Sequence, residues 1–168
     1  MLDFLRETTM LATRGRSGGF ASLQTEKTMD LNDFLGPKPS VIDLHAEDRW
    51  GAIDELINHL VTTQKIKSED RDAIAESVKK RETAMSTGIG FGIGIPHTST
   101  DLIGETVGVL GRSRKGIRFD ALDGQPVKLV MLFLVPQGQF QKHVHTLANI
   151  AKLLHKHDFR EGLEGGFE

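Results

Sequence analysis

The chain has 168 residues, of which 38% are hydrophobic and 26% charged, and its formal net charge is −2. These values are typical of one soluble globular domain with a core of its own, and they give no support for a nucleic-acid or anionic-membrane partner. The absence of cysteine excludes disulfides, thiolate metal sites and cysteine nucleophiles and fits a reducing cytoplasm. No apolar run is long enough for direct insertion into a membrane.

Residues 1–29 are predicted to form a disordered leader, because they show no regular apolar period and lack the apolar core of a signal peptide. Met29 directly precedes the first organised segment, so we expect the natural start there. The folded domain is predicted to cover residues 30–164 and to be followed by a short tail, 165–168.

Alternating helix and strand patterns fill the first half of this domain. The spacing of apolar residues and the positions of glycine and proline predict a short helix at 31–35, a strand at 40–44, an amphipathic helix over 47–63 and a second helix that ends near Arg81. Ser68 is the expected N-cap of this second helix. Arg81 then lies at the inner edge of its last turn.

Residues 88–97 alternate glycine with a large apolar residue and end on Pro96-His97. In one extended strand, side chains two apart share a face. The side chains expected to project together are those of Ile89, Phe91, Ile93, Ile95 and His97. The glycines leave the other face bare, which weakens a strand unless another backbone or a ligand comes close.

Pro96 is expected to end this strand and to place His97 at its carboxyl edge, where open α/β sheets bind ligands. A phosphate-binding loop is not indicated, because no lysine follows the glycines and the G-x-G-x-x-G spacing is incomplete. A buried strand that ends on a histidine by chance remains an alternative. The hydroxyl-rich residues 98–101 favour a plain turn, with contact to an anion as the second interpretation.

Strands are predicted at 106–110 and 127–135, separated by a loop at 120–126. The second strand is almost continuously apolar, which is typical of a central strand covered on both faces. This strand therefore requires helices above and below the sheet.

A further helix is predicted over 140–154, with His143, Leu147, Ile150 and Leu154 on one stripe. His143 is expected to face inward near the amino end of the helix, where free N–H groups favour an anion. His145 should point to solvent. A hydrogen-bonded histidine at the edge of the core is the alternative for His143.

The pairs His143/His145 and His155/His157 do not favour a metal site. Residues at i and i+2 point to opposite sides of a helix, whereas helical zinc ligands use i and i+4. We therefore predict no metal and no cofactor.

Four motifs stand out along the chain: Arg81-Glu82, Ser86-Thr87-Gly88-Ile89-Gly90, Gly94-Ile95-Pro96-His97, and His143 leading into residues 147–154. Taken together, they resemble the enzyme IIA domain of the bacterial phosphoenolpyruvate-dependent phosphotransferase system, in its fructose/mannitol branch with the nitrogen-regulatory relatives. The resemblance covers about residues 30–162. It implies a single α/β domain with a mixed, mostly parallel sheet of about five strands and helices on both faces, in agreement with the element order.

The resemblance implies that His97 is the phosphoryl acceptor, that Arg81 pairs with the phosphoryl group and that His143 is the second active-site histidine. Thr98 and Ser99 are candidate phosphate contacts, although Thr98 stands where glycine or alanine is common in the family. We expect the bare glycines to leave space for a partner's histidine or cysteine. The usual final helix looks short or missing.

The function implied is that of a phosphocarrier, which accepts a phosphoryl group from a histidine-containing phosphocarrier protein and passes it to a IIB domain for sugar uptake. The alternative is a nitrogen-type regulatory phosphoprotein, in which the phosphorylation state of His97 controls protein binding without transport. A metal-dependent hydrolase is a remote alternative, because the histidine spacings are unfavourable for shared chelation.

Overall fold

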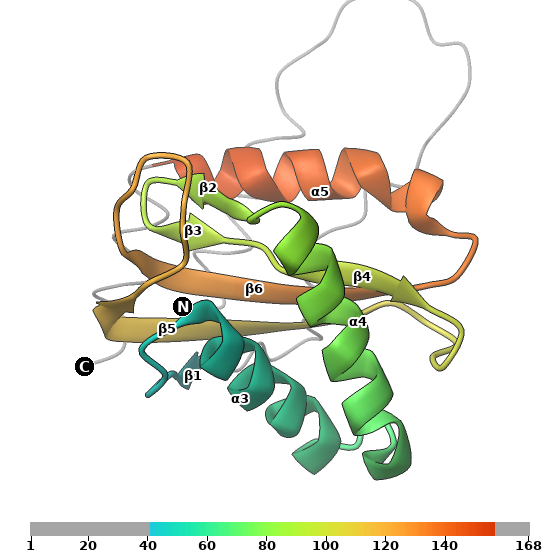
Figure 1. Ribbon diagram of the computed structural model, residues 1–168. Coiled ribbons are helices and arrows are strands. Elements are labelled where there is room, and N and C mark those ends of the chain that lie inside the picture. The colour runs from blue at the N-terminus through green and yellow to red at the C-terminus, as the bar shows by residue number, and fades with distance from the viewer. Residues whose placement is uncertain (1–40, 157–168) are drawn as a thin grey trace, which may run out of the picture.

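A computed structural model describes residues 41–156 of the protein (Figure 1). The predicted leader, the predicted helix at 31–35 and the predicted tail lie outside the described residues. The helices are α3 (Arg49–Thr62), the 3₁₀ turn η1 (Ser68–Asp70), α4 (Arg71–Ala84) and α5 (Phe140–His155). The strands are β1 (Val41–Asp43), β2 (Gly88–Gly90), β3 (Ile93–Gly94), β4 (His97–Thr100), β5 (Val107–Ile117) and β6 (Val127–Pro136).

The strands form one mixed sheet in the order β1-β5-β6-β3-β2, with β4 also paired to β6. The pairs β1/β5, β3/β6 and β4/β6 are parallel, whereas β5/β6 and β2/β3 are antiparallel. The predicted α/β class with a mixed sheet is confirmed, with six strands within residues 41–156 in place of about five.

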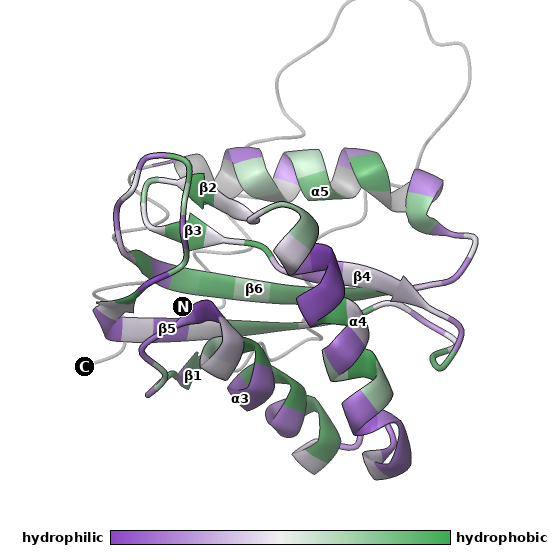
Figure 2. Cartoon of the chain, viewed as in Figure 1, coloured by the Kyte–Doolittle hydropathy of each residue, from purple (hydrophilic) through white to green (hydrophobic). Residues whose placement is uncertain are grey.

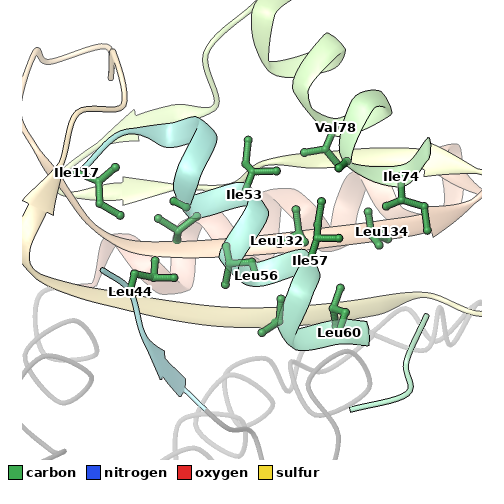
Figure 3. Close-up of a cluster of buried hydrophobic side chains, with 14 of the residues drawn as sticks. Leu44, Ile53, Leu56, Ile57, Leu60, Ile74, Val78, Ile117, Leu132 and Leu134 are labelled. Carbon is green, nitrogen blue, oxygen red and sulfur yellow. The ribbon is translucent and has the colours of Figure 1, made fainter. Parts of the chain in front are cut away.

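Helices cover both faces of the sheet: α3 and α4 lie on one side and α5 on the other (Figure 1). Strand β6 divides its side chains between the two cores, as the twofold alternation of a strand requires. Leu132 and Leu134 join the cluster under α3 and α4 (Figure 3), and Met131 and Phe133 join the cluster on the α5 side. Apart from Lys128, every residue of β6 is buried, and Figure 2 shows the strand as an apolar band, which confirms the predicted central strand.

Helix α3 begins where the sequence provides a cap. Asp48 has an extended backbone, and its carboxylate accepts a hydrogen bond from Gly51 N at 2.9 Å. The buried residues recur at helical spacing and make a single stripe against the sheet. They are Ala52, Ile53, Leu56, Ile57 and Leu60.

The predicted cap of the next helix is wrong. Ser68 starts the 3₁₀ turn η1, and Asp70 precedes α4 without a side-chain cap hydrogen bond. A backbone hydrogen bond of the 3₁₀ turn takes the place of a side-chain cap here, because Asp70 N donates to Lys67 O at 3.1 Å. Arg71 and Lys79 then bind the two oxygens of Asp54 at 3.0 and 2.8 Å, which ties α4 to α3.

The prediction of one strand through residues 88–97 is also wrong. Gly90, Phe91 and Gly92 all have positive φ and reverse the chain, so that β2 and β3 pair as an antiparallel hairpin. Phe91 is consequently 62% exposed while Ile93 is fully buried, although both were expected on one face.

Strand β3 ends at Gly94, just before Ile95-Pro96, and His97 is the first residue of β4 rather than the last residue of the preceding strand as predicted. The register along β6 continues without a shift, from Ile93 opposite Leu129 to His97 opposite Phe133. Proline is tolerated here because only its carbonyl faces β6, where it accepts from Phe133 N at 3.0 Å. Residues 98–100, predicted as a turn, continue β4.

The bare face of the glycines is filled from within the molecule. A Cβ on Gly88 would lie 2.7 Å from Ala121 Cα, and one on Gly94 would lie 2.9 Å from the ring of Phe119. The expected close approach of a backbone is therefore confirmed. The expectation that these glycines leave space for a partner is wrong, because the segment after β5 occupies that space.

Gly88→Ala is expected to destabilise the fold by about 1–3 kcal/mol, since the added methyl group meets backbone that has no room to move. Urea unfolding followed by the fluorescence of Trp50 measures this loss. Gly104→Ala is the matched control, because a Cβ there meets nothing within 4 Å. Equal unfolding midpoints for the two variants would contradict the packing described here.

Candidate active site

His97 lies between two helices at the start of β4. Its imidazole is half-buried and stacks on the ring of Phe140, the first residue of α5, with centroids 6.0 Å apart and planes inclined by 17°. On the other side of the sheet, α4 packs against β4. The site is thus built from one strand and the ends of two helices.

The orientation of the imidazole follows from one hydrogen bond. His97 Nδ1 lies 2.9 Å from the carbonyl oxygen of Ile95. A carbonyl oxygen only accepts, so Nδ1 carries the hydrogen and Nε2 of the neutral ring keeps its lone pair. The tautomer with a nucleophilic Nε2 is therefore the one that the backbone stabilises.

The environment lowers the pKa of His97 below the ordinary value of 6.5. Burial is the largest cause, because it disfavours the imidazolium, and the positive charge of Arg81 acts in the same direction. The hydrogen bond to Ile95 and the negative charge of Glu82 oppose the shift without cancelling it. The ring is consequently neutral at pH 7, which nucleophilic attack requires.

Arg81 is the cationic residue predicted for this site, and its role there stays a prediction. It lies in the last turn of α4, is half-buried, and donates from Nη1 to the carbonyl of Met85 at 3.3 Å. Its charge acts on His97, which places a guanidinium within electrostatic reach of the imidazole. A forked cationic donor of this kind suits an incoming phosphoryl group.

The two hydroxyl candidates differ in their surroundings. Thr98 Oγ1 lies 2.9 Å from Ser77 Oγ of α4, so this hydroxyl is already engaged by the helix. Ser99 is exposed and, two residues after His97 in the strand, shares its face. Phosphate contact by Thr98 and Ser99 stays a prediction.

His143 lies in the first turn of α5, three residues after Phe140, and its side chain is outside the described part of the structure. Its inward orientation therefore stays a prediction. Two other residues of the helix agree with the predicted face, because His145 is exposed and Leu147 packs against the core. The side chains of Ile150 and Leu154, the rest of the predicted stripe, lie outside the described part of the structure.

Sequence reasoning missed Phe140, which stacks on the imidazole, and Glu82, whose charge acts on it. The available signal for Phe140 was an aromatic residue at the start of a predicted helix. For Glu82 the only signal was its place beside Arg81 in the first motif. Among residues 41–156, no group of three histidine, aspartate or glutamate side chains could hold a metal ion, and no helix is long and apolar enough to cross a bilayer.

Comparisons with known proteins identify the family of this chain. The family model for the phosphoenolpyruvate-dependent sugar phosphotransferase system, EIIA 2, matches residues 34–166, so the chain belongs to this family. The fructose-specific EIIA component of Haloferax volcanii is 39% identical over 138 residues, which cover 80% of this chain and 88% of that protein. The resemblance inferred from the four motifs is thereby confirmed.

Solved structures give the same fold. The nitrogen regulatory protein IIA-Ntr from Neisseria meningitidis superimposes with a TM-score of 0.66 at 29% identity, covering 74% of this chain and 83% of that one. The complex of enzyme IIAMTL with phosphorylated enzyme IIBMTL from Escherichia coli matches with a TM-score of 0.52 at 21% identity, covering 86% and 98%. At this last identity the likeness shows the fold alone.

A pH titration of the His97 ring by NMR is expected to give a midpoint below 6.5. The unfolded chain then takes up a proton near pH 6.5 before the folded chain does, so this group lowers the free energy of unfolding as the pH falls through 6.5. Phe140→Leu should raise the midpoint toward 6.5 by exposing the ring. Phe91→Leu, the same change at an exposed phenylalanine, is the control, and an equal shift in both variants would argue against burial as the cause.

Proposed function

We propose that this protein is a histidine phosphocarrier that accepts a phosphoryl group on Nε2 of His97. The hydrogen bond from His97 Nδ1 to the carbonyl of Ile95 carries the proposal, since it leaves Nε2 as the nucleophile. The lowered pKa of His97 supports it, because the ring is neutral at physiological pH. Membership of the EIIA family supports transfer of a phosphoryl group as the chemistry.

In the proposed reaction, the lone pair of Nε2 attacks the phosphorus of a phosphohistidine on the upstream phosphocarrier protein. The new N–P bond forms as the donor's N–P bond breaks, and the donor imidazole keeps the electron pair. The Nδ1–H of His97 stays on the ring, and its hydrogen bond to Ile95 stabilises the positive charge that develops there. Attack by a nucleophile of the downstream partner reverses the step and restores neutral His97.

Arg81 is proposed to stabilise the negative charge on the phosphoryl oxygens. Phosphoryl transfer needs little covalent chemistry from the protein beyond alignment and charge compensation. A guanidinium at the end of α4 provides both through two parallel N–H donors. We assign His143 as a further donor to the same group and Ser99 as a candidate contact, on the strength of their places in α5 and β4.

A IIB domain is the proposed downstream partner, and the cytoplasm is the proposed location. The Escherichia coli complex pairs an enzyme IIA of this fold with a phosphorylated IIB, and the fructose-specific relative from Haloferax volcanii supports a role in sugar uptake. The likeness to a nitrogen regulatory protein supports a second candidate, a regulator whose binding depends on phosphorylation of His97.

His97→Ala is expected to abolish phosphorylation by the upstream phosphocarrier, and Arg81→Ala to slow it by about a hundredfold, as loss of a preorganised charge donor does. Transfer of radioactive phosphate from phosphoenolpyruvate through the purified upstream proteins measures both rates. His145→Ala is the matched control for His143→Ala, because His145 is exposed on the same helix. Equal damage from these two histidine variants would show that the helix face is assigned wrongly.

The carrier and the regulator are separated by the fate of the phosphoryl group. Phosphorylated protein mixed with purified IIB domains from the same cell should lose its label to one of them within seconds, because an in-line acceptor completes the transfer. Retention of the label in the presence of every IIB domain would exclude the carrier and favour the regulator.

A further inference from the structure

Glu82 is a buried carboxylate beside the proposed site. Its side chain is 1% exposed, and it accepts hydrogen bonds from Thr87 N at 2.9 Å and from Thr87 Oγ1 at 2.6 Å. Arg49 at the start of α3 approaches within 3.7 Å and provides the opposite charge. Burying a carboxylate costs free energy unless such donors surround it, so these contacts hold the side chain of Glu82 in place.

A short series of hydrogen bonds leads from Glu82 to the imidazole. Thr87, held by the carboxylate, accepts from Ile95 N at 3.1 Å through its own carbonyl oxygen. The carbonyl of Ile95 in turn accepts from His97 Nδ1 at 2.9 Å. Each bond fixes the orientation of a peptide group, and the last of these groups selects the tautomer of the ring.

We propose that Glu82 is a positioning residue for phosphoryl acceptance, which holds Thr87 and, through Ile95, keeps the Nδ1–H tautomer of His97 with Nε2 directed at the phosphoryl group. This inference rests on the proposed function of His97. No contact between Glu82 and the phosphoryl group is involved.

The place of Glu82 on α4 gives it a second effect. Arg81 is the preceding residue, in the last turn of the helix, and the chain leaves the helix at Met85. The bonds from the carboxylate to Thr87 therefore fix the path of the segment that follows the guanidinium. In this proposal the buried carboxylate of Glu82 positions both His97 and Arg81.

The charge of Glu82 and its hydrogen bonds have separable consequences. The negative charge raises the pKa of His97, so removing it lowers that pKa further and leaves the ring neutral at pH 7. A loss of rate at pH 7.5 in a Glu82 variant is thus not explained by protonation of His97. It reports the position or tautomer of the ring.

Glu82→Gln and Thr87→Val test the proposal. Both weaken the Glu82–Thr87 contact, and Thr87→Ser, which keeps the hydroxyl, is the conservative rescue. Glu76→Gln is the matched control, because Glu76 is an exposed carboxylate on the same helix. Two-bond ¹H–¹⁵N NMR spectra of the unphosphorylated protein at pH 7.5 report which nitrogen of His97 carries the hydrogen.

We expect Glu82→Gln and Thr87→Val to lower the ratio of the Nδ1–H to the Nε2–H tautomer by roughly fivefold, as loss of one hydrogen bond predicts, and to slow phosphorylation by at most the same factor, because the rate follows the fraction of the Nδ1–H tautomer. Thr87→Ser and Glu76→Gln should retain the wild-type spectrum and rate. If Glu82→Gln does not fold, as urea unfolding would show, Thr87→Val alone decides the outcome.

An unchanged tautomer ratio in a folded Thr87→Val variant would overturn the role of Glu82, and so would an equal change in Glu76→Gln. The spectra need no phosphoryl donor. If the wild-type protein proved not to accept phosphate on His97, the proposed function would fail while the tautomer measurement still decided whether Glu82 positions the ring.

Discussion

The hydrogen bond between His97 Nδ1 and the carbonyl of Ile95 is the interaction on which the site depends, and it requires a carbonyl that cannot rotate. The peptide groups on either side of Ile95 meet that requirement. The N–H of Ile95 donates to the carbonyl of Thr87, and the next carbonyl along the chain, that of Pro96, accepts from the N–H of Phe133. Proline fits between them because its fixed φ restricts the chain and no ladder partner is needed for its nitrogen. The imidazole is thus oriented by backbone, which is more rigid than a side-chain partner would be.

The same segment explains why the glycines are present. Strands β3 and β4 continue one register along β6, so the backbone on both sides of Ile95-Pro96 is paired to the same strand of the sheet. The ring of Phe119 packs against Gly94, where an added Cβ would lie 2.9 Å from the ring. The hairpin turn is held in addition by Asp123, which accepts from Phe91 N at 3.0 Å. The glycines therefore admit the protein's own aromatic ring and loop backbone, and this dense packing holds the segment that leads to His97.

The sequence was sufficient for elements whose pattern is local. The apolar run at 127–135 predicted a covered central strand with helices on both faces, and the stripe of α3 predicted the buried face of that helix, because burial repeats with the period of the element. The hairpin within residues 88–97 was missed, since the positive φ values of Gly90, Phe91 and Gly92 go with a contact to Asp123, more than thirty residues away along the chain. Likewise, Pro96-His97 marked a candidate nucleophile, but its tautomer depends on backbone bonds from Thr87 and Ile95, and these leave no pattern in side-chain types. The prediction of Ser68 as a helix cap was wrong for a related reason, because Ser68 begins a 3₁₀ turn whose backbone hydrogen bonds precede α4.

The positive charge of Arg81 is favourable at two stages of the proposed reaction. Before transfer, the charge of Arg81 helps to keep His97 neutral, in the same direction as burial. After transfer, a phosphoryl group with negative oxygens takes the place of solvent, and the same charge becomes favourable. Glu82 would oppose both effects if its carboxylate faced the ring unscreened. Its hydrogen bonds to Thr87 and the nearby guanidinium of Arg49 occupy its oxygens instead. An acid can therefore lie next to the proposed phosphoryl acceptor and hold the backbone, while the charge of Arg81 has the larger effect on His97.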